Sequence, residues 1–112
     1  MKIQIIKCLQ DNFSYLVIDE TTLNACVVDP SEAEPVIDFI DNNNINLKYI
    51  LNTHHHYDHV GGNIELKKKY NSTIVGFKGD RDRIPEIDIL VDDFEIWKKD
   101  SFEAKIYHIP GH

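Results

Sequence analysis

The sequence has little of what marks membrane, secreted or nucleic-acid-binding proteins. Its two cysteines, Cys8 and Cys26, form no C-x-x-C pair and lie in apolar runs, so we expect two reduced core thiols. No apolar stretch approaches the roughly 20 residues that span a bilayer, and the start of the chain shows no secretory signal. Lys and Arg number 12 against 19 Asp and Glu, and the net charge of -7 argues against nucleic acid and anionic membranes as partners. We therefore expect a cytoplasmic protein that binds neither.

Short apolar runs dominate the beginning of the chain, which at 112 residues fits one domain at most. Apolar residues with a two-residue period predict strands at residues 3–6, 15–19 and 25–29. A turn at residues 19–24 separates the last two. Such a meander favours antiparallel pairing at this end of a sheet.

The period changes to that of a helix after residue 30. Ser31 and Glu34 form an S-x-x-E capping box, and apolar residues follow at helical spacing until the asparagine run at 42–44. The remaining chain predicts a buried strand at 47–53, a helix at 63–70, a strand at 72–77 and a hairpin of strands at 94–97 and 103–109, with an irregular surface segment at 80–93. Strands that alternate with helices after an antiparallel start indicate a layered α/β or α+β fold.

The segment "THHHYDHVGGN", residues 53–63, crowds histidines into a single loop. His54, His56 and Asp58 alternate, so in an extended segment all three side chains project to one side. His59 can turn towards the same space if the backbone bends into a helix, and the two glycines behind it allow that bend and a close approach of backbone. His55 and Tyr57 point the opposite way, which suits packing better than metal binding.

Neutral imidazoles with a carboxylate are the ligands that Zn²⁺ or a neighbouring transition metal prefers, so this segment predicts a metal site. A further donor is expected from the end of the chain. His112 follows a Pro-Gly turn after the last strand and is predicted to be a ligand, whereas His108, inside that strand, is predicted to be structural. Three histidines with an open fourth position make a catalytic type of site. Asp58 and His59 would then form half of a second site, as in two-metal hydrolases.

Asp29 is another carboxylate of interest, because it follows a predicted strand directly. It is either an acceptor that orients a ligand histidine or a plain cap of the strand end.

The segment at 53–63 closely resembles the H-x-H-x-D-H signature of the metallo-β-lactamase superfamily. The third histidine and the G-G-N tail resemble its glyoxalase II (hydroxyacylglutathione hydrolase) branch, as do the stretches "DNFSYLVID", "VVDP" and "IPGH". The resemblance implies an αββα sandwich. Residues 1–112 would form the first half of that domain, with the rest of it and a C-terminal substrate-binding region absent.

Carried over by position, the resemblance implies that His54, His56 and His112 bind one metal and that Asp58 and His59 bind another. Zinc is expected, with iron or manganese as alternatives, and Asp58 is also implied as the catalytic carboxylate. The implied reaction is hydrolysis of S-(2-hydroxyacyl)glutathione, such as S-lactoylglutathione, to glutathione and a 2-hydroxy acid, which serves methylglyoxal detoxification. The full enzyme is expected to be a monomer.

Because the chain carries only part of the family's ligand set, we expect it alone to bind one metal, to be inactive and to self-associate through uncovered sheet surface. Two other readings stay open. The protein could be another hydrolase of the superfamily, such as a lactonase, or a persulfide dioxygenase. From a different class, it could be a non-catalytic metal-binding module.

Overall fold

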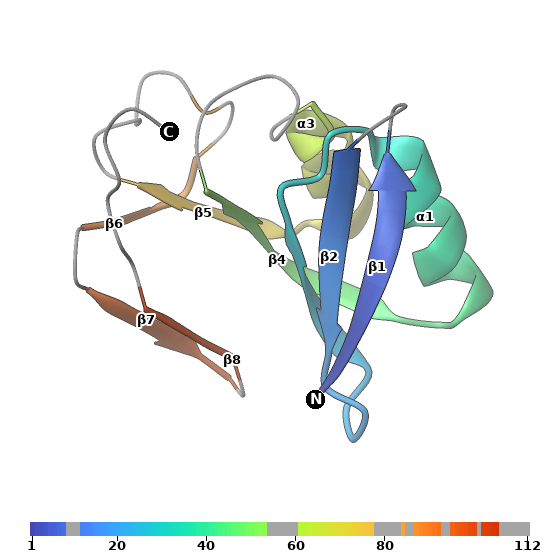
Figure 1. The fold of residues 1–112 in the computed structure, drawn as a ribbon, viewed down its shortest axis with the longest axis horizontal. Coiled ribbons are helices and arrows are strands. Elements are labelled where there is room, and N and C mark those ends of the chain that lie inside the picture. The colour runs from blue at the N-terminus through green and yellow to red at the C-terminus, as the bar shows by residue number, and fades with distance from the viewer. Residues whose placement is uncertain are drawn as a thin grey trace.

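The structure, a computed structural model, describes residues 1–8, 12–53, 61–77, 84, 87–92, 95–100 and 102–105. These residues form a large sheet, a two-stranded sheet and two helices (Figure 1). In chain order the elements are β1 (Lys2–Cys8), β2 (Asn12–Ile18), β3 (Asn24–Val28), α1 (Ala33–Asn42), β4 (Asn46–Asn52), α3 (Asn63–Tyr70), β5 (Thr73–Phe77), β6 (Ile89–Val91), β7 (Ile96–Lys99) and β8 (Phe102–Lys105).

The large sheet has six strands in sequential order, from β1 to β6. β1, β2 and β3 pair antiparallel, whereas β3, β4, β5 and β6 pair parallel. Parallel neighbours need a crossover connection, and α1 and α3 supply the two crossovers on either side of β4. The mixed α/β fold predicted from the sequence, with an antiparallel start, is confirmed.

The main core lies between the large sheet and the two helices, which cover one of its faces (Figure 1). Alternate strand residues point into this layer, as the two-residue period predicted, and meet the apolar stripe of α1. Its largest fully buried side chains are Leu16, Val27, Val36, Ile40, Ile50, Leu66 and Ile74. Each contributes about 1.5–3 kcal/mol through removal of apolar surface from water.

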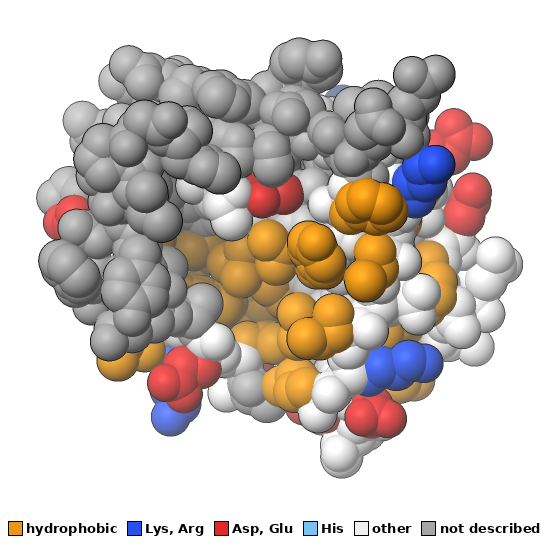
Figure 2. Space-filling view, viewed as in Figure 1, with side chains coloured by type: hydrophobic (Ala, Val, Ile, Leu, Met, Phe, Trp, Pro, Cys, Tyr) orange, Lys and Arg blue, Asp and Glu red, His pale blue; other side chains and the backbone are white. Residues whose placement is uncertain are grey.

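The opposite face of the sheet is covered only in part among the described residues. Trp97 of β7 and Phe102 of β8 pack edge-on against Tyr49 of β4, with ring centroids 5.2 and 6.0 Å apart. Over β1 and β2 the same face stays open, and Figure 2 shows hydrophobic side chains gathered there. Ile3, Ile5, Phe13 and Tyr15 are the large exposed members of this open apolar face.

Two expectations about the elements are wrong. Residues 80–93 were expected to form an irregular surface, but they include strand β6 and the buried Ile84. The predicted capping box does not form, because α1 has Glu32 at its N-cap and no side-chain cap hydrogen bond. The helix begins at Ala33, so Ser31 lies one residue too early to cap it.

The other predicted elements are confirmed among the described residues, although β7 extends to Lys99 and makes the hairpin turn tighter than expected. The last strand, predicted at 103–109, is confirmed as far as Lys105, and residues 106–109 lie outside the described part of the chain. Within the described part of the chain, no helix is long and apolar enough to cross a membrane. Both cysteines are buried and free of disulfides, as expected.

Candidate metal centre

The histidine-rich segment lies between the end of β4 and the start of α3. Residues 54–60 are outside the described part of the chain, as are residues 106–112, so the predicted ligands His54, His56, Asp58, His59 and His112 stay predictions. His55, Tyr57 and His108 lie outside it as well. Accordingly, the described residues contain no cluster of three or more His, Cys, Asp or Glu side chains. The structure does describe the residues on either side of the segment and their partners, which we call the frame of the segment.

Asp29 holds the residue at which this segment begins. Its carboxylate accepts hydrogen bonds from the backbone N–H of Thr53, at 2.7 Å, and from the Thr53 hydroxyl. Its own backbone is fixed too, because its N–H donates to the Leu51 carbonyl at 2.9 Å and its carbonyl accepts from the Ser14 hydroxyl at 2.8 Å. Asp29 is buried and has a left-handed backbone, with φ of 52°, which aspartate tolerates better than most residues.

These contacts bear on the two readings of Asp29. The carboxylate reaches across from the end of β3 to the residue after β4, so it does more than cap its own strand. It fixes Thr53, which precedes the first predicted ligand in the sequence. A direct hydrogen bond from Asp29 to a ligand histidine stays a prediction.

Gly62 fixes the other end of the segment against the chain between β3 and α1. Its N–H donates to the Pro30 carbonyl at 2.7 Å. A Cβ atom at this position would lie 3.0 Å from Pro30 O, Glu32 C and Ala33 N, all of them backbone atoms. Glycine is therefore needed here for close approach of two backbones, as the sequence predicted for this glycine pair.

A pair of asparagine side chains links the two ends directly. Asn52, the last residue of β4, and Asn63, the first of α3, exchange hydrogen bonds between their amides. The Asn63 Nδ2 donates to the Asn52 Oδ1 at 2.6 Å, and the Asn52 Nδ2 donates to the Asn63 Oδ1 at 3.2 Å. Both side chains are buried. Sequence reasoning missed this pair; its signal was one asparagine directly before Thr53 and another directly after the two glycines.

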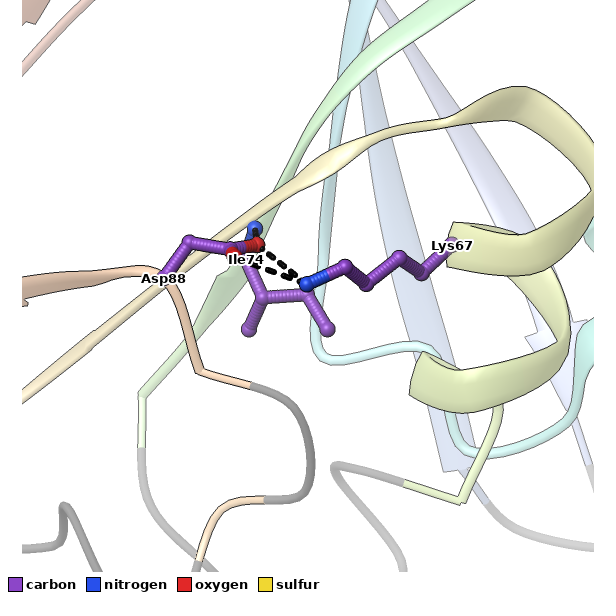
Figure 3. Close-up of polar contacts among 3 residues, drawn as sticks. All are labelled: Lys67, Ile74 and Asp88. Atoms are coloured by element: carbon purple, nitrogen blue, oxygen red, sulfur yellow. Dashed lines mark hydrogen bonds and ion pairs between the residues drawn. The ribbon is translucent and has the colours of Figure 1, made fainter.

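Helix α3 is also tied to the sheet on its far side (Figure 3). Lys67 Nζ donates to both carboxylate oxygens of Asp88, at 2.7 and 2.8 Å, and the Ile74 N–H donates to Asp88 Oδ2 at 2.9 Å. Partial burial alone would raise the pKa of Asp88, but the Ile74 amide and the Lys67 ammonium together lower it. The charged carboxylate therefore links the helix that follows the segment to β5.

The described thiols offer no alternative metal site. Burial raises the pKa of Cys26 to about 12, so the thiol stays protonated at neutral pH and is a poor ligand. Cys8 lies 3.3 Å from the Ser14 hydroxyl in the core. Both cysteines therefore act as small buried side chains.

The frame suits the donor set that the sequence supplies. The carboxyl ends of β3 and β4 meet at the same edge of the sheet because the two strands are parallel, and α3 begins at that edge. Loops beyond the carboxyl ends of parallel strands are the usual place for binding residues in layered α/β folds. Imidazoles and a carboxylate in such a loop fit a divalent transition metal.

Comparison with known proteins agrees with this arrangement. Residues 10–112 match the family model described as the metallo-beta-lactamase superfamily. A protein of Pelagibacter ubique named hydroxyacylglutathione hydrolase is 67% identical over the whole chain, and one of Methylococcus capsulatus with the same name is 44% identical over 96% of it. The chain spans 47% and 42% of these two proteins, so it covers about half the length of the curated relatives it matches.

Solved structures share the fold at low sequence identity. The B3 metallo-beta-lactamase BLEG-1 superposes with a TM-score of 0.88 at 18% identity, over 98% of this chain and 62% of that one. The ETHE1 protein of Myxococcus xanthus superposes with a TM-score of 0.75 at 20% identity, over 92% of this chain and 46% of that one. With the family model matching nearly all of its length, the chain belongs to the metallo-beta-lactamase superfamily.

Proposed function

We propose that this chain forms the metal-binding half of a hydroxyacylglutathione hydrolase. The substrate would be the thioester of an S-(2-hydroxyacyl)glutathione such as S-lactoylglutathione, and the products glutathione and a 2-hydroxy acid. The observation that carries the proposal is the H-x-H-x-D-H segment at the carboxyl end of β4, in a chain 67% identical to a protein with that name. Its full-length relatives extend well beyond the part that this chain matches.

The predicted ligands fall into two groups. His54, His56 and His112 would hold one divalent metal, and Asp58 and His59 would belong to a second site. We expect zinc first, with iron or manganese as alternatives, because histidine and aspartate accept all three. When bound, such ions supply Lewis acidity and lower the pKa of water towards neutrality. The chain alone is expected to retain one metal, because only two ligands of the second site are present.

The remaining catalytic and positioning roles would belong to the chain's own residues. Asp58 would hold its metal and accept a hydrogen bond from the attacking water, which orients a lone pair towards the thioester carbonyl. Asp29 would keep the start of the segment in place through Thr53. No strong general acid is needed, because a thiol with a pKa of about 8.5 leaves readily as thiolate.

The cellular location, the oligomeric state and the place of the glutathione-binding residues belong to the same proposal. A glutathione thioester is a small intracellular metabolite, so we place the enzyme in the cytoplasm. We also expect the full-length enzyme to be a monomer. The residues that recognise glutathione would lie outside this chain. The acidic balance of these 112 residues therefore does not conflict with an anionic substrate.

The test is a thioesterase assay on the product of the complete gene. It should hydrolyse S-lactoylglutathione, and His54→Ala or Asp58→Asn should lower kcat/KM by about a hundredfold or more. The isolated 112-residue chain should show negligible turnover. Cleavage of a lactone or oxidation of a persulfide without thioester cleavage would contradict the proposal in favour of those activities. Metal binding without any of the three would indicate a non-catalytic module.

A further inference from the structure

The amides of Asn52 and Asn63 join the two ends of the histidine-rich segment directly, side chain to side chain. Two further contacts hold the ends to consecutive residues of the chain after β3, Thr53 to Asp29 and Gly62 to Pro30. The two amides lie face to face with two antiparallel hydrogen bonds, at 2.6 and 3.2 Å. This arrangement fixes both the separation of the two backbones and their relative rotation.

Both amides are buried, with exposed fractions of 6% for Asn52 and 0% for Asn63. A buried amide is unfavourable unless it is hydrogen-bonded, and apolar side chains of similar size would fill the same space without that requirement. A hydrogen-bonded pair of buried polar groups restricts the relative orientation of its two backbones more than it adds to stability, because only one mutual orientation satisfies both partners. The pair lies at the two ends of the ligand-bearing segment, so this restriction would limit the arrangements that the segment can adopt.

We propose that Asn52 and Asn63 are positioning residues that set the metal affinity of the segment between them. The inference rests on the proposed metal site. Ligands on a loop bind a metal more tightly when the ends of the loop are already held at the right distance, since less conformational freedom is lost on binding. The amide pair does this without contributing a ligand atom.

The experiment separates positioning from simple stabilisation by means of a double variant. Asn52→Leu and Asn63→Leu each break the two hydrogen bonds between these amides and place a buried amide against an apolar side chain, so each should lower the stability of the metal-free chain. The combined Asn52→Leu/Asn63→Leu variant removes both buried amides, so neither faces an apolar side chain, and it should recover part of that stability. It still lacks the two hydrogen bonds that fix the relative orientation of the two ends of the segment.

Ser72→Ala is the matched control. It removes a buried side-chain hydrogen bond of 2.8 Å to the Leu47 carbonyl, near the opposite end of β4. The readouts for all variants are urea unfolding of the metal-free chain, Zn²⁺ affinity by chelator competition, and the visible absorption bands of bound Co²⁺.

Both single variants and the double variant should bind Zn²⁺ ten- to a hundredfold more weakly, the range typical of residues that orient metal ligands. Their Co²⁺ bands should shift or weaken, while Ser72→Ala should lose stability and keep the wild-type affinity and spectrum. A double variant with wild-type Zn²⁺ affinity, or an affinity that follows stability across every variant including Ser72→Ala, would overturn the inference. If a single variant does not fold, the double variant decides. A wild-type chain that binds no Zn²⁺ would instead overturn the metal site itself.

Discussion

Asp29 and Thr53 lie 24 positions apart in the sequence, yet the carboxylate of the first accepts hydrogen bonds from both the backbone N–H and the hydroxyl of the second. The contact joins the ends of two parallel strands, β3 and β4. It therefore fixes the backbone immediately before the first predicted metal ligand. This relationship makes the frame of the segment testable apart from any activity.

Asp29→Asn should destabilise the metal-free chain by about 1.5–3 kcal/mol, because an amide oxygen replaces a charged acceptor and its NH₂ group faces a donor. Thr53→Val removes only the hydroxyl and keeps the N–H, so it should cost about 1 kcal/mol. Urea unfolding followed by circular dichroism measures both. Equal losses for the two variants, or none for Asp29→Asn, would speak against the contact as described.

Gly62→Ala should be destabilising by about 1–3 kcal/mol, because the added methyl group would press against three backbone atoms that cannot move independently. Gly76→Ala is the matched control. There the new Cβ would meet the Cδ1 atoms of Ile84 and Ile87, at 2.7 and 2.9 Å, and these flexible ends can turn away. Thermal unfolding should rank Gly62→Ala well below Gly76→Ala; the reverse order would contradict the close approach at Gly62.

Asp88 should make stability depend on pH in the acid range. Its pKa is lowered in the folded state, so its contribution is present above the ordinary value of 3.8 and is lost as the pH falls through the lowered pKa. Asp88→Asn should cost about 1 kcal/mol at neutral pH and flatten this part of the profile. Lys67→Met should cost less, because the Ile74 N–H remains bonded to the carboxylate. A profile that is unchanged in Asp88→Asn would refute the assignment.

The open apolar face over β1 and β2 should cause self-association of the 112-residue chain. Ile3 and Ile5 on this face are 64% and 56% exposed, and apolar patches of this kind associate in water. Ile5→Lys should shift the chain towards monomer in sedimentation velocity. Ile64→Lys changes an exposed isoleucine on α3 and should have no such effect. A wild-type chain that sediments as a monomer would contradict the expectation.

Much of the fold could be predicted because local pattern and burial agree. The two-residue period of β1 and β2 and the helical stripe of α1 are visible without knowledge of neighbours, since each element buries one face. β6 could not be seen in this way. It has three residues inside a charged stretch, and it is a strand only because it pairs with β5, from Val75 opposite Ile89 to Phe77 opposite Val91.

In the candidate site too, some residues could be proposed from the sequence, whereas the contacts that hold them could not. Spacing and residue type alone indicate the chemistry of residues 54–59, and these ligands stay predictions because they lie outside the described part of the chain. The frame could not be predicted, because the partners of Asn63 and of Thr53 depend on which strands are neighbours. Asp29 was recognised as a candidate from its place at a strand end, but its hydrogen bonds to Thr53 were not foreseen, and a bond to a ligand histidine stays a prediction. Contacts between residues distant in the sequence need the topology before they can be named.

Whether the histidine-rich segment binds a metal is best decided from the metal content of the purified chain after dialysis, with His55→Ala as the matched control for His54→Ala. We expect about one zinc per wild-type chain, retained in His55→Ala and lost in His54→Ala and His56→Ala. The two neighbouring histidines differ only in the side of the segment to which they are predicted to point. Equal retention of metal in His54→Ala and His55→Ala, or no metal in the wild-type chain, would show that this segment does not bind a metal through the predicted ligands.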